Sequence, residues 1–228
     1  MIKAGSTAAG RLPVLVGASA LALGVASALG AAPAAAATIS IATPCVIYDQ
    51  ATVSAGVPIT GSGFTAGDNV SFQSTPGDAF GDGTVGPDGT FAAGFVPPTP
   101  PDLGAPAVST FTLSATDGAV SATTSFLEAP LAVATKPARA KPNKTVTFDF
   151  SGFASGAPIY AHYLHKKKVV ATKRFGIAHG PCGVLGTRSK FFPGRERYDN
   201  YTVQVDDARK YSPGASPKLL ATLTKTFR

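Results

Sequence analysis

The sequence predicts an all-β fold made of two tandem immunoglobulin-like β-sandwiches after an N-terminal signal peptide. The main observation is an internal repeat, because residues 59–72 (ITGSGFTAGDNVSF) return 89 positions later as residues 148–161 (FDFSGFASGAPIYA). That offset is close to the length of one immunoglobulin-like sandwich, about 100 residues. Helical periodicity is absent after the N-terminal segment, whereas β-prone runs bounded by Gly, Pro, Asp and Asn recur at sandwich spacing.

Each copy of the repeat contains a Ser-Gly-Phe step, two small residues and a further glycine. Glycine accepts the left-handed backbone of a tight connection, and the neighbouring Phe can close the end of a sandwich. Downstream, Pro87-Asp88-Gly89 predicts a hairpin turn, and residues 180–183 (GPCG) stand at the matching place in the second copy. We expect the last two strands of each copy at residues 110–115 and 119–127, and at 201–205 and 219–227.

The chain resembles the tandem immunoglobulin-like repeats of bacterial secreted and cell-surface proteins. The first copy carries their G-x-G-F-x-x-G step (61–67), D-G-T-F turn (88–91) and T-x-T-x-x-A-T-D-G run (110–118). The second copy keeps the Gly-Phe step, the G-P-x-G turn and the strand rhythm. The resemblance implies sandwiches used for display, adhesion or spacing, and it transfers no catalytic residues.

The N-terminal segment has the layout of a secretory signal peptide. Lys3 and Arg11 precede an apolar run, residues 12–29, which ends in a small-residue tract up to Ala37. We expect residues 1–37 to be the signal peptide, residues 38–128 the first domain and residues 131–228 the second. The predicted location is secreted or cell-surface, with no transmembrane span after cleavage; the alternative is a retained N-terminal anchor.

Charge is segregated between the two predicted domains. Residues 12–135 contain no Lys or Arg and eight acids, whereas residues 136–228 contain 18 Lys or Arg and five acids. Solubility alone does not explain such a separation of sign between two copies of one fold. A domain this basic raises the local concentration of polyanions, and the attraction weakens with salt.

The bases of the second domain fall into three clusters, at residues 166–168 with 173–174, at residues 188–197, and at Arg209 and Lys210. Residues 166–168 lie between two β-prone runs, 159–164 and 169–175, and therefore predict a hairpin tip. The alternative is that these clusters are merely solvated turns and strand faces. The candidate binding residues are Lys166, Lys167, Lys168, Lys173, Arg174, Arg188, Lys190, Arg195 and Arg197.

The sequence offers little that resembles a catalytic or metal site. His162 and His165 are three apart on a predicted strand, so they face opposite sides and make a poor metal pair; we expect both at the surface. The run around Cys182 (HGPC) lacks the further residues of a cysteine nucleophile motif. No hydrolase, metalloprotease or dinucleotide-binding motif is present, so we expect a non-enzymatic protein without cofactor or metal.

Cys45 and Cys182 are the only cysteines, and one falls in each predicted domain. Pairing is the default in an oxidising compartment, so an interdomain disulfide is one hypothesis. The first-strand position of Cys45 and the turn position of Cys182 place both near the junction of the domains in an immunoglobulin-like topology. The alternatives are a free exposed thiol and an intermolecular bridge.

The sequence favours a secreted or cell-surface binding module whose basic second domain docks on an anionic cell-envelope polymer or a phospholipid surface. The first alternative is a structural spacer or adhesin with charge-mediated domain association or self-association. A cell-wall enzyme of unrecognised type is the least favoured. Nucleic acid is a weaker candidate partner, because most aromatic residues among the bases stand at core-like alternate positions.

Overall fold

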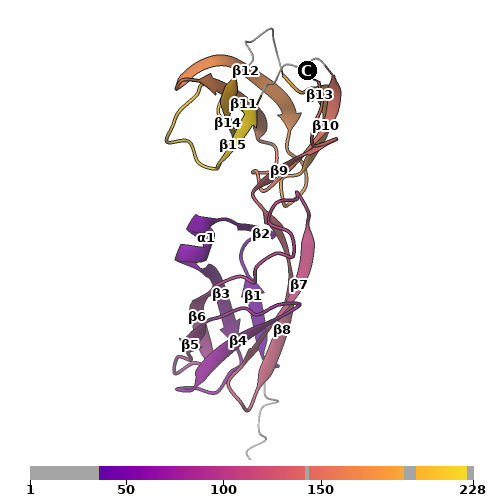
Figure 1. The fold of residues 1–228 in the computed structure, drawn as a ribbon. Coiled ribbons are helices and arrows are strands. Elements are labelled where there is room, and N and C mark those ends of the chain that lie inside the picture. The colour runs from indigo at the N-terminus through magenta and orange to yellow at the C-terminus, as the bar shows by residue number, and fades with distance from the viewer. Residues whose placement is uncertain (1–35, 142–143, 193–198, 225–228) are drawn as a thin grey trace, which may run out of the picture. The chain divides into compact units, whose positions relative to one another are not determined.

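The computed structural model describes residues 36–141, 144–192 and 199–224. The predicted signal peptide lies outside the described residues except for its last two positions. Nearly all regular structure in the described part is β-strand, arranged in four sheets (Figure 1). None of the helices found there is long and apolar enough to cross a membrane.

The first two sheets form the N-terminal sandwich. One sheet has the order β1-β3-β6, from Thr38–Ile41, Val57–Ser62 and Thr90–Phe95. The other has the order β2-β8-β7-β4-β5, from Cys45–Tyr48, Ser121–Pro130, Ser109–Thr116, Asn69–Thr75 and Asp82–Thr84. These strand pairs are antiparallel, except that β2 runs parallel to the last residues of β8. Figure 1 shows β7 and β8 as a long pair of strands. Alternating inward residues, Phe72, Phe91, Phe95, Phe111 and Phe126 among them, build one buried core.

The other two sheets form the C-terminal sandwich. One sheet has the order β13-β10-β9, from Leu185–Lys190, Thr145–Ser151 and Ala132–Lys136. The other has the order β12-β11-β14-β15, from Lys168–Ile177, Pro158–His165, Asn200–Asp206 and Lys218–Thr224. This sandwich has its own buried core, which includes Phe148, Phe150, Ile159, Tyr163 and Val205. The fold is therefore all-β, with two immunoglobulin-like sandwiches in tandem.

The repeated glycine motif performs the same local task in both sandwiches. The amide of Gly67 donates to the carbonyl of Val85 at 3.1 Å, and the amide of Gly156 donates to Ala178 at 2.8 Å. Both glycines have positive φ, 85° and 81°. In each sandwich this hydrogen bond joins the start of a strand, β4 or β11, to a residue just before the turn at 86–89 or 180–183. The shared hydrogen bond explains why the motif recurs.

The predicted turn at residues 87–89 exists, but it does not join two strands of one sheet. It connects β5 in the five-stranded sheet to β6 in the three-stranded sheet. The turn at residues 180–183 likewise connects β12 to β13, which belong to different sheets. The hairpin interpretation was wrong at both places, because a local turn signal does not reveal which sheet the next strand enters.

Three further differences concern the N-terminal sandwich. The first strand is split, so that β1 joins one sheet and β2 the other. A short helix, α1 (Gln50–Ala55), begins after Asp49, whose side chain accepts from the Thr52 amide at 2.7 Å. Six residues are too few for a helical period to stand out in the sequence. Strand β8 also extends to Pro130, beyond the expected end at residue 127.

The turn at 180–183 supplies a sharp test of backbone fit. At Gly183 (φ +56°) an added Cβ would overlap the Phe153 carbonyl, whereas at Gly180 (φ +70°) a Cβ meets nothing within 4 Å. We expect Gly180→Ala to lower the free energy of unfolding by about 1 kcal/mol, and Gly183→Ala by at least about 3 kcal/mol. Denaturant unfolding of the two variants measures the difference, and equal losses would contradict this packing.

Candidate anion-binding site

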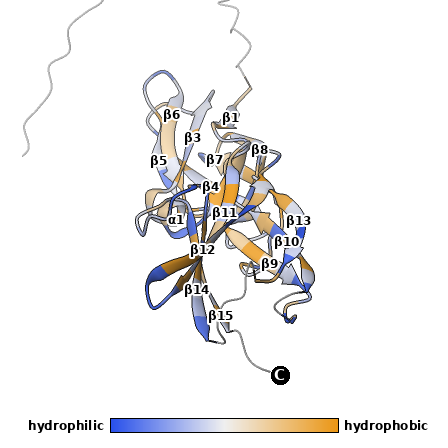
Figure 2. Ribbon diagram, turned by 90° about the horizontal axis from the view of Figure 1, so that it is seen from above, coloured by the Kyte–Doolittle hydropathy of each residue, from blue (hydrophilic) through white to orange (hydrophobic). Residues whose placement is uncertain are grey.

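The described candidate binding residues lie on strands β12 and β13 and on the tip that precedes β12. Lys166 and Lys167 form the β11–β12 tip, both with positive φ, and Lys168 opens β12. Arg188 and Lys190 are exposed on β13, whose hydrophilic residues are blue in Figure 2. Strands β12 and β13 are edge strands of their sheets, and they contact each other. Arg195 and Arg197 lie outside the described residues.

Lys173 has a structural role inside this sandwich. Its Nζ donates to the Ser189 hydroxyl and, at 3.2 Å, to the Lys190 carbonyl, so it ties β12 to β13. The same Nζ lies 5.1 Å from the centre of the Phe175 ring. Burial lowers the pKa of Lys173, and the nearby charge of Lys190 lowers it further. Lys173 is therefore already engaged, unlike the exposed bases around it.

A buried polar network lies on the outer face of sheet β12-β11-β14-β15. His162 and Asp206 are both fully buried, and His162 Nε2 contacts Asp206 Oδ1 at 3.2 Å and the Ala208 carbonyl at 3.0 Å. Nδ1 of His162 lies 3.0 Å from the Thr172 hydroxyl. The second oxygen of Asp206 accepts from the side chain of Gln204. The loop of residues 207–217 between β14 and β15 contacts the network through the carbonyls of Ala208 and Ser212.

This network corrects the expectation that both histidines are surface residues. His162 is buried because strand pairing sets it opposite Thr172 on β12 and Gln204 on β14. His165 is part-exposed and pairs with Asp199 at 2.7 Å. The alternation that separates the two rings was visible in the sequence, but the partners were not, since they come from strands with unknown register.

An open pocket of about 550 Å³ adjoins the network on the same face. It is lined by Tyr160, Thr172, Arg174 and Arg209. Tyr160 pairs with Arg174 across β11 and β12, and His162 pairs with Thr172 two residues further along β11. All four side chains therefore lie on one face of the sheet. Arg209 comes from the loop of residues 207–217. Of these residues only Arg174 was among the sequence candidates.

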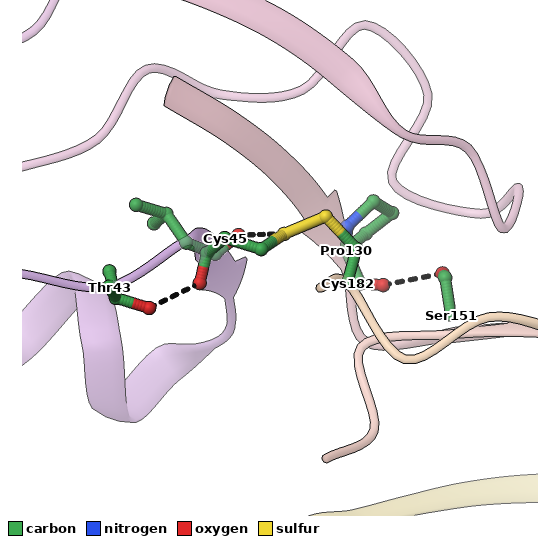
Figure 3. The surroundings of a disulfide bond; sticks show 6 residues. Thr43, Cys45, Pro130, Ser151 and Cys182 are labelled. Atoms are coloured by element: carbon green, nitrogen blue, oxygen red, sulfur yellow. Dashed lines mark hydrogen bonds between the residues drawn. A yellow bond between two sulfur atoms is a disulfide. The ribbon is translucent and has the colours of Figure 1, made fainter. Parts of the chain in front are cut away.

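The two cysteines form a disulfide, shown in Figure 3. Cys45 begins β2 and Cys182 lies in the turn of residues 180–183, with Cα atoms 5.2 Å apart. Both are buried, together with Ala129. Next to the disulfide, the Ser151 hydroxyl donates to the Pro130 carbonyl at 2.6 Å. The bonded sulfur of Cys182 is not available as a nucleophile.

Glu128 is a buried acid without a hydrogen-bond partner. It lies on β8, is 1% exposed, and neither carboxylate oxygen has a partner among the described residues. Burial raises the pKa of Glu128 from 4.5 to about 8. The charge count from the sequence treated this residue as ionised, whereas it is mostly neutral at pH 7. The described residues contain no group of three His, Cys, Asp or Glu side chains placed to hold a metal ion.

Several solved structures are similar to the chain. A tandem immunoglobulin pair of titin matches with 10% identity, covering 82% of this chain and 94% of that chain, at a TM-score of 0.25. The YadV chaperone matches with 10% identity, covering 81% of this chain and 99% of that chain, at a TM-score of 0.25. A DUF3823 family protein from Bacteroides ovatus matches with 9% identity, covering 84% of this chain and 100% of that chain, at a TM-score of 0.26. Neither a protein-family model nor a curated protein matches the sequence.

Proposed function

We propose that the protein is a secreted or cell-surface, non-enzymatic binding module whose basic C-terminal sandwich docks on an anionic polymer of the cell envelope. The observation that carries the proposal is the separation of charge, with no Lys or Arg in residues 12–135 and 18 from residue 136 onward. Distributed Lys and Arg side chains attract a polyanion through its many charges rather than through one shape. A phospholipid surface offers a similar array of charges.

The positions of the bases support this function. Lys166, Lys167, Lys168, Arg188 and Lys190 are all exposed. Lys166 and Lys167 occupy left-handed backbone positions, φ 47° and 67°, where Gly or Asn would be less strained. Most aromatic rings of this sandwich lie in its core, including Phe148, Phe150 and Tyr163, so they are not free to stack on the bases of a nucleic acid.

Retention on purified cell envelope or on heparin should fall steeply as NaCl rises from about 0.15 to 0.5 M, because screening shortens the range of the attraction to a few ångströms. The variant Lys166→Asn/Lys167→Asn/Lys168→Gln should elute at lower salt, since Asn tolerates the left-handed turn while the charge is lost. Thermal unfolding of the variant serves as the folding control. Retention that is insensitive to salt would rule out this mode of binding.

A structural spacer or adhesin is the second candidate, favoured by the opposite charges of the two sandwiches. That function predicts that salt changes self-association of the chain and not its retention on a polymer. Sedimentation velocity at the same salt concentrations separates the two candidates: a monomer throughout, with salt-sensitive polymer binding, supports the binding module.

A further inference from the structure

The outer-face pocket of the C-terminal sandwich has two arginine residues in its lining. Arg174 projects from the exposed face of β12, and Arg209 projects from the loop of residues 207–217. Within the part of the chain that the structure describes, neither forms an ion pair. Two like charges that line one pocket repel each other unless an anion lies between them, so the pocket is electrostatically suited to an anionic group.

The loop that carries Arg209 is held in place by buried contacts. The Ala208 amide donates to Asp206 Oδ1 at 2.9 Å, and the Ala208 carbonyl contacts His162 Nε2. Further along, the Ser212 carbonyl accepts from Gln204 Nε2 at 2.7 Å. The backbone is therefore anchored on both sides of Arg209, which lowers the entropy cost of ordering this loop on binding.

The remaining lining residues complete a site with both charge and shape. The Tyr160 side chain contributes a ring and a hydroxyl that can donate a hydrogen bond. Thr172 is fixed by the contact of its hydroxyl with His162. Guanidinium forks match the paired oxygens of phosphate, sulfate and carboxylate groups, and charge-assisted hydrogen bonds of this kind are about twice as strong as neutral ones.

We propose that the pocket lined by Tyr160, Thr172, Arg174 and Arg209 binds a single phosphate, sulfate or carboxylate group. The claim that this pocket anchors one charged unit of the polymer rests on the proposed function. The claim that it binds a small anion does not. The pocket adds a fixed geometry to the diffuse attraction of the exposed bases. Arg209, which the sequence showed in a basic cluster but which was not among the candidate binding residues, becomes a principal binding residue.

The test titrates the full chain with inorganic phosphate, sulfate and galacturonate, and with neutral galactose, followed by ¹H–¹⁵N NMR. The three anions should shift the amides around residues 172–174 and 208–210, and galactose should not. The variant Arg174→Gln/Arg209→Gln should weaken anion binding at least about tenfold, since a hydrogen bond to a charged group contributes about 1.5 to 3 kcal/mol. The variant Arg139→Gln/Lys141→Gln removes the same charge from the exposed β9–β10 loop and should bind as the unchanged chain does.

Each outcome decides a separate point. If the arginine variant and the control variant bind anions equally, or if the amide shifts occur in another part of the chain, the proposal that this pocket binds anions is wrong. Retention of both variants on the polymer at equal salt means that diffuse charge alone binds it, so the proposed function stands and the anchoring role fails. Anion binding in the pocket without any polymer retention supports the site and removes the proposed function. The NMR spectra also report whether each variant is folded.

Discussion

The variant Cys45→Ala/Cys182→Ala is expected to lose about 4 to 5 kcal/mol of unfolding free energy relative to the oxidised chain. The bond joins residues 137 positions apart, so it closes a long loop in the unfolded state and removes much of its entropy. Both sulfurs lie in the apolar surroundings of Ala129, and the substitution also removes that buried contact. Guanidinium unfolding of the two proteins at one pH measures the difference.

The matching control is the oxidised chain treated with a reductant before unfolding, which removes the cross-link without changing the sequence. Reduced protein and double variant should unfold at similar denaturant concentrations. Peptide mapping under non-reducing conditions should recover a cross-linked fragment that contains both cysteines. Two alkylated thiols in freshly produced protein, or a stability difference below about 1 kcal/mol, would contradict a stabilising disulfide.

Glu128→Gln is expected to stabilise the protein at pH 9 by about 2 to 4 kcal/mol more than at pH 5. The folded pKa of Glu128 is raised, so the neutral carboxyl stabilises the folded state below pH 4.5. This stabilisation is lost as pH rises from 4.5 to about 8, because the unfolded chain ionises first. The amide cannot ionise, and the pH-dependent loss disappears.

Urea unfolding from pH 5 to pH 9 measures this effect for the original chain and the variant. Asp68→Asn is the matched control, since it removes one negative charge from an exposed position of the same sandwich. The difference between Glu128→Gln and the original chain should grow with pH, whereas no comparable growth is expected for Asp68→Asn. A constant offset across the whole range would show that the buried carboxyl is ionised or absent from the folded core.

The fold was largely predictable because its signals are local. The Gly-Phe repeat recurs because Gly67 and Gly156 make equivalent backbone bonds, and a local motif of this kind is readable in one sequence. The Lys166 hairpin tip was predictable for the same reason, since two β-prone runs flank it. Strand rhythm and turn residues therefore gave the order of elements, although not the sheet that each strand enters.

The candidate site was less predictable because it depends on register. His162 is buried by partners that pair with it from β12 and β14, 10 and 42 positions away. Arg209 reaches the pocket only because the loop after β14 folds over the outer face of the sheet. A sequence signal was nevertheless present: Gln204 and Asp206 continue the polar alternation that begins at Asn200 and Thr202, and this pattern indicates either a solvated face or a buried network.

The same limit applies to Glu128. In the sequence it is one of eight acids in residues 12–135, and its neighbours do not distinguish a surface position from a buried one. Its burial follows from the pairing of β8 with both β2 and β7, which sets Glu128 opposite Val46 and Ser109. Long-range pairing, not local composition, decides the environment of such a residue.

The most direct test of the central claim is equilibrium binding of the full chain to charged polymers and to a neutral polymer with the same backbone as one of them. Polygalacturonate and its methyl ester share one backbone, and a glycerol phosphate polymer provides a second anionic partner. If the basic sandwich docks on anionic polymers, both charged polymers bind at low salt, the ester does not, and the dissociation constants rise steeply with NaCl. Equal binding of acid and ester, or no binding of either charged polymer at low salt, would contradict the account.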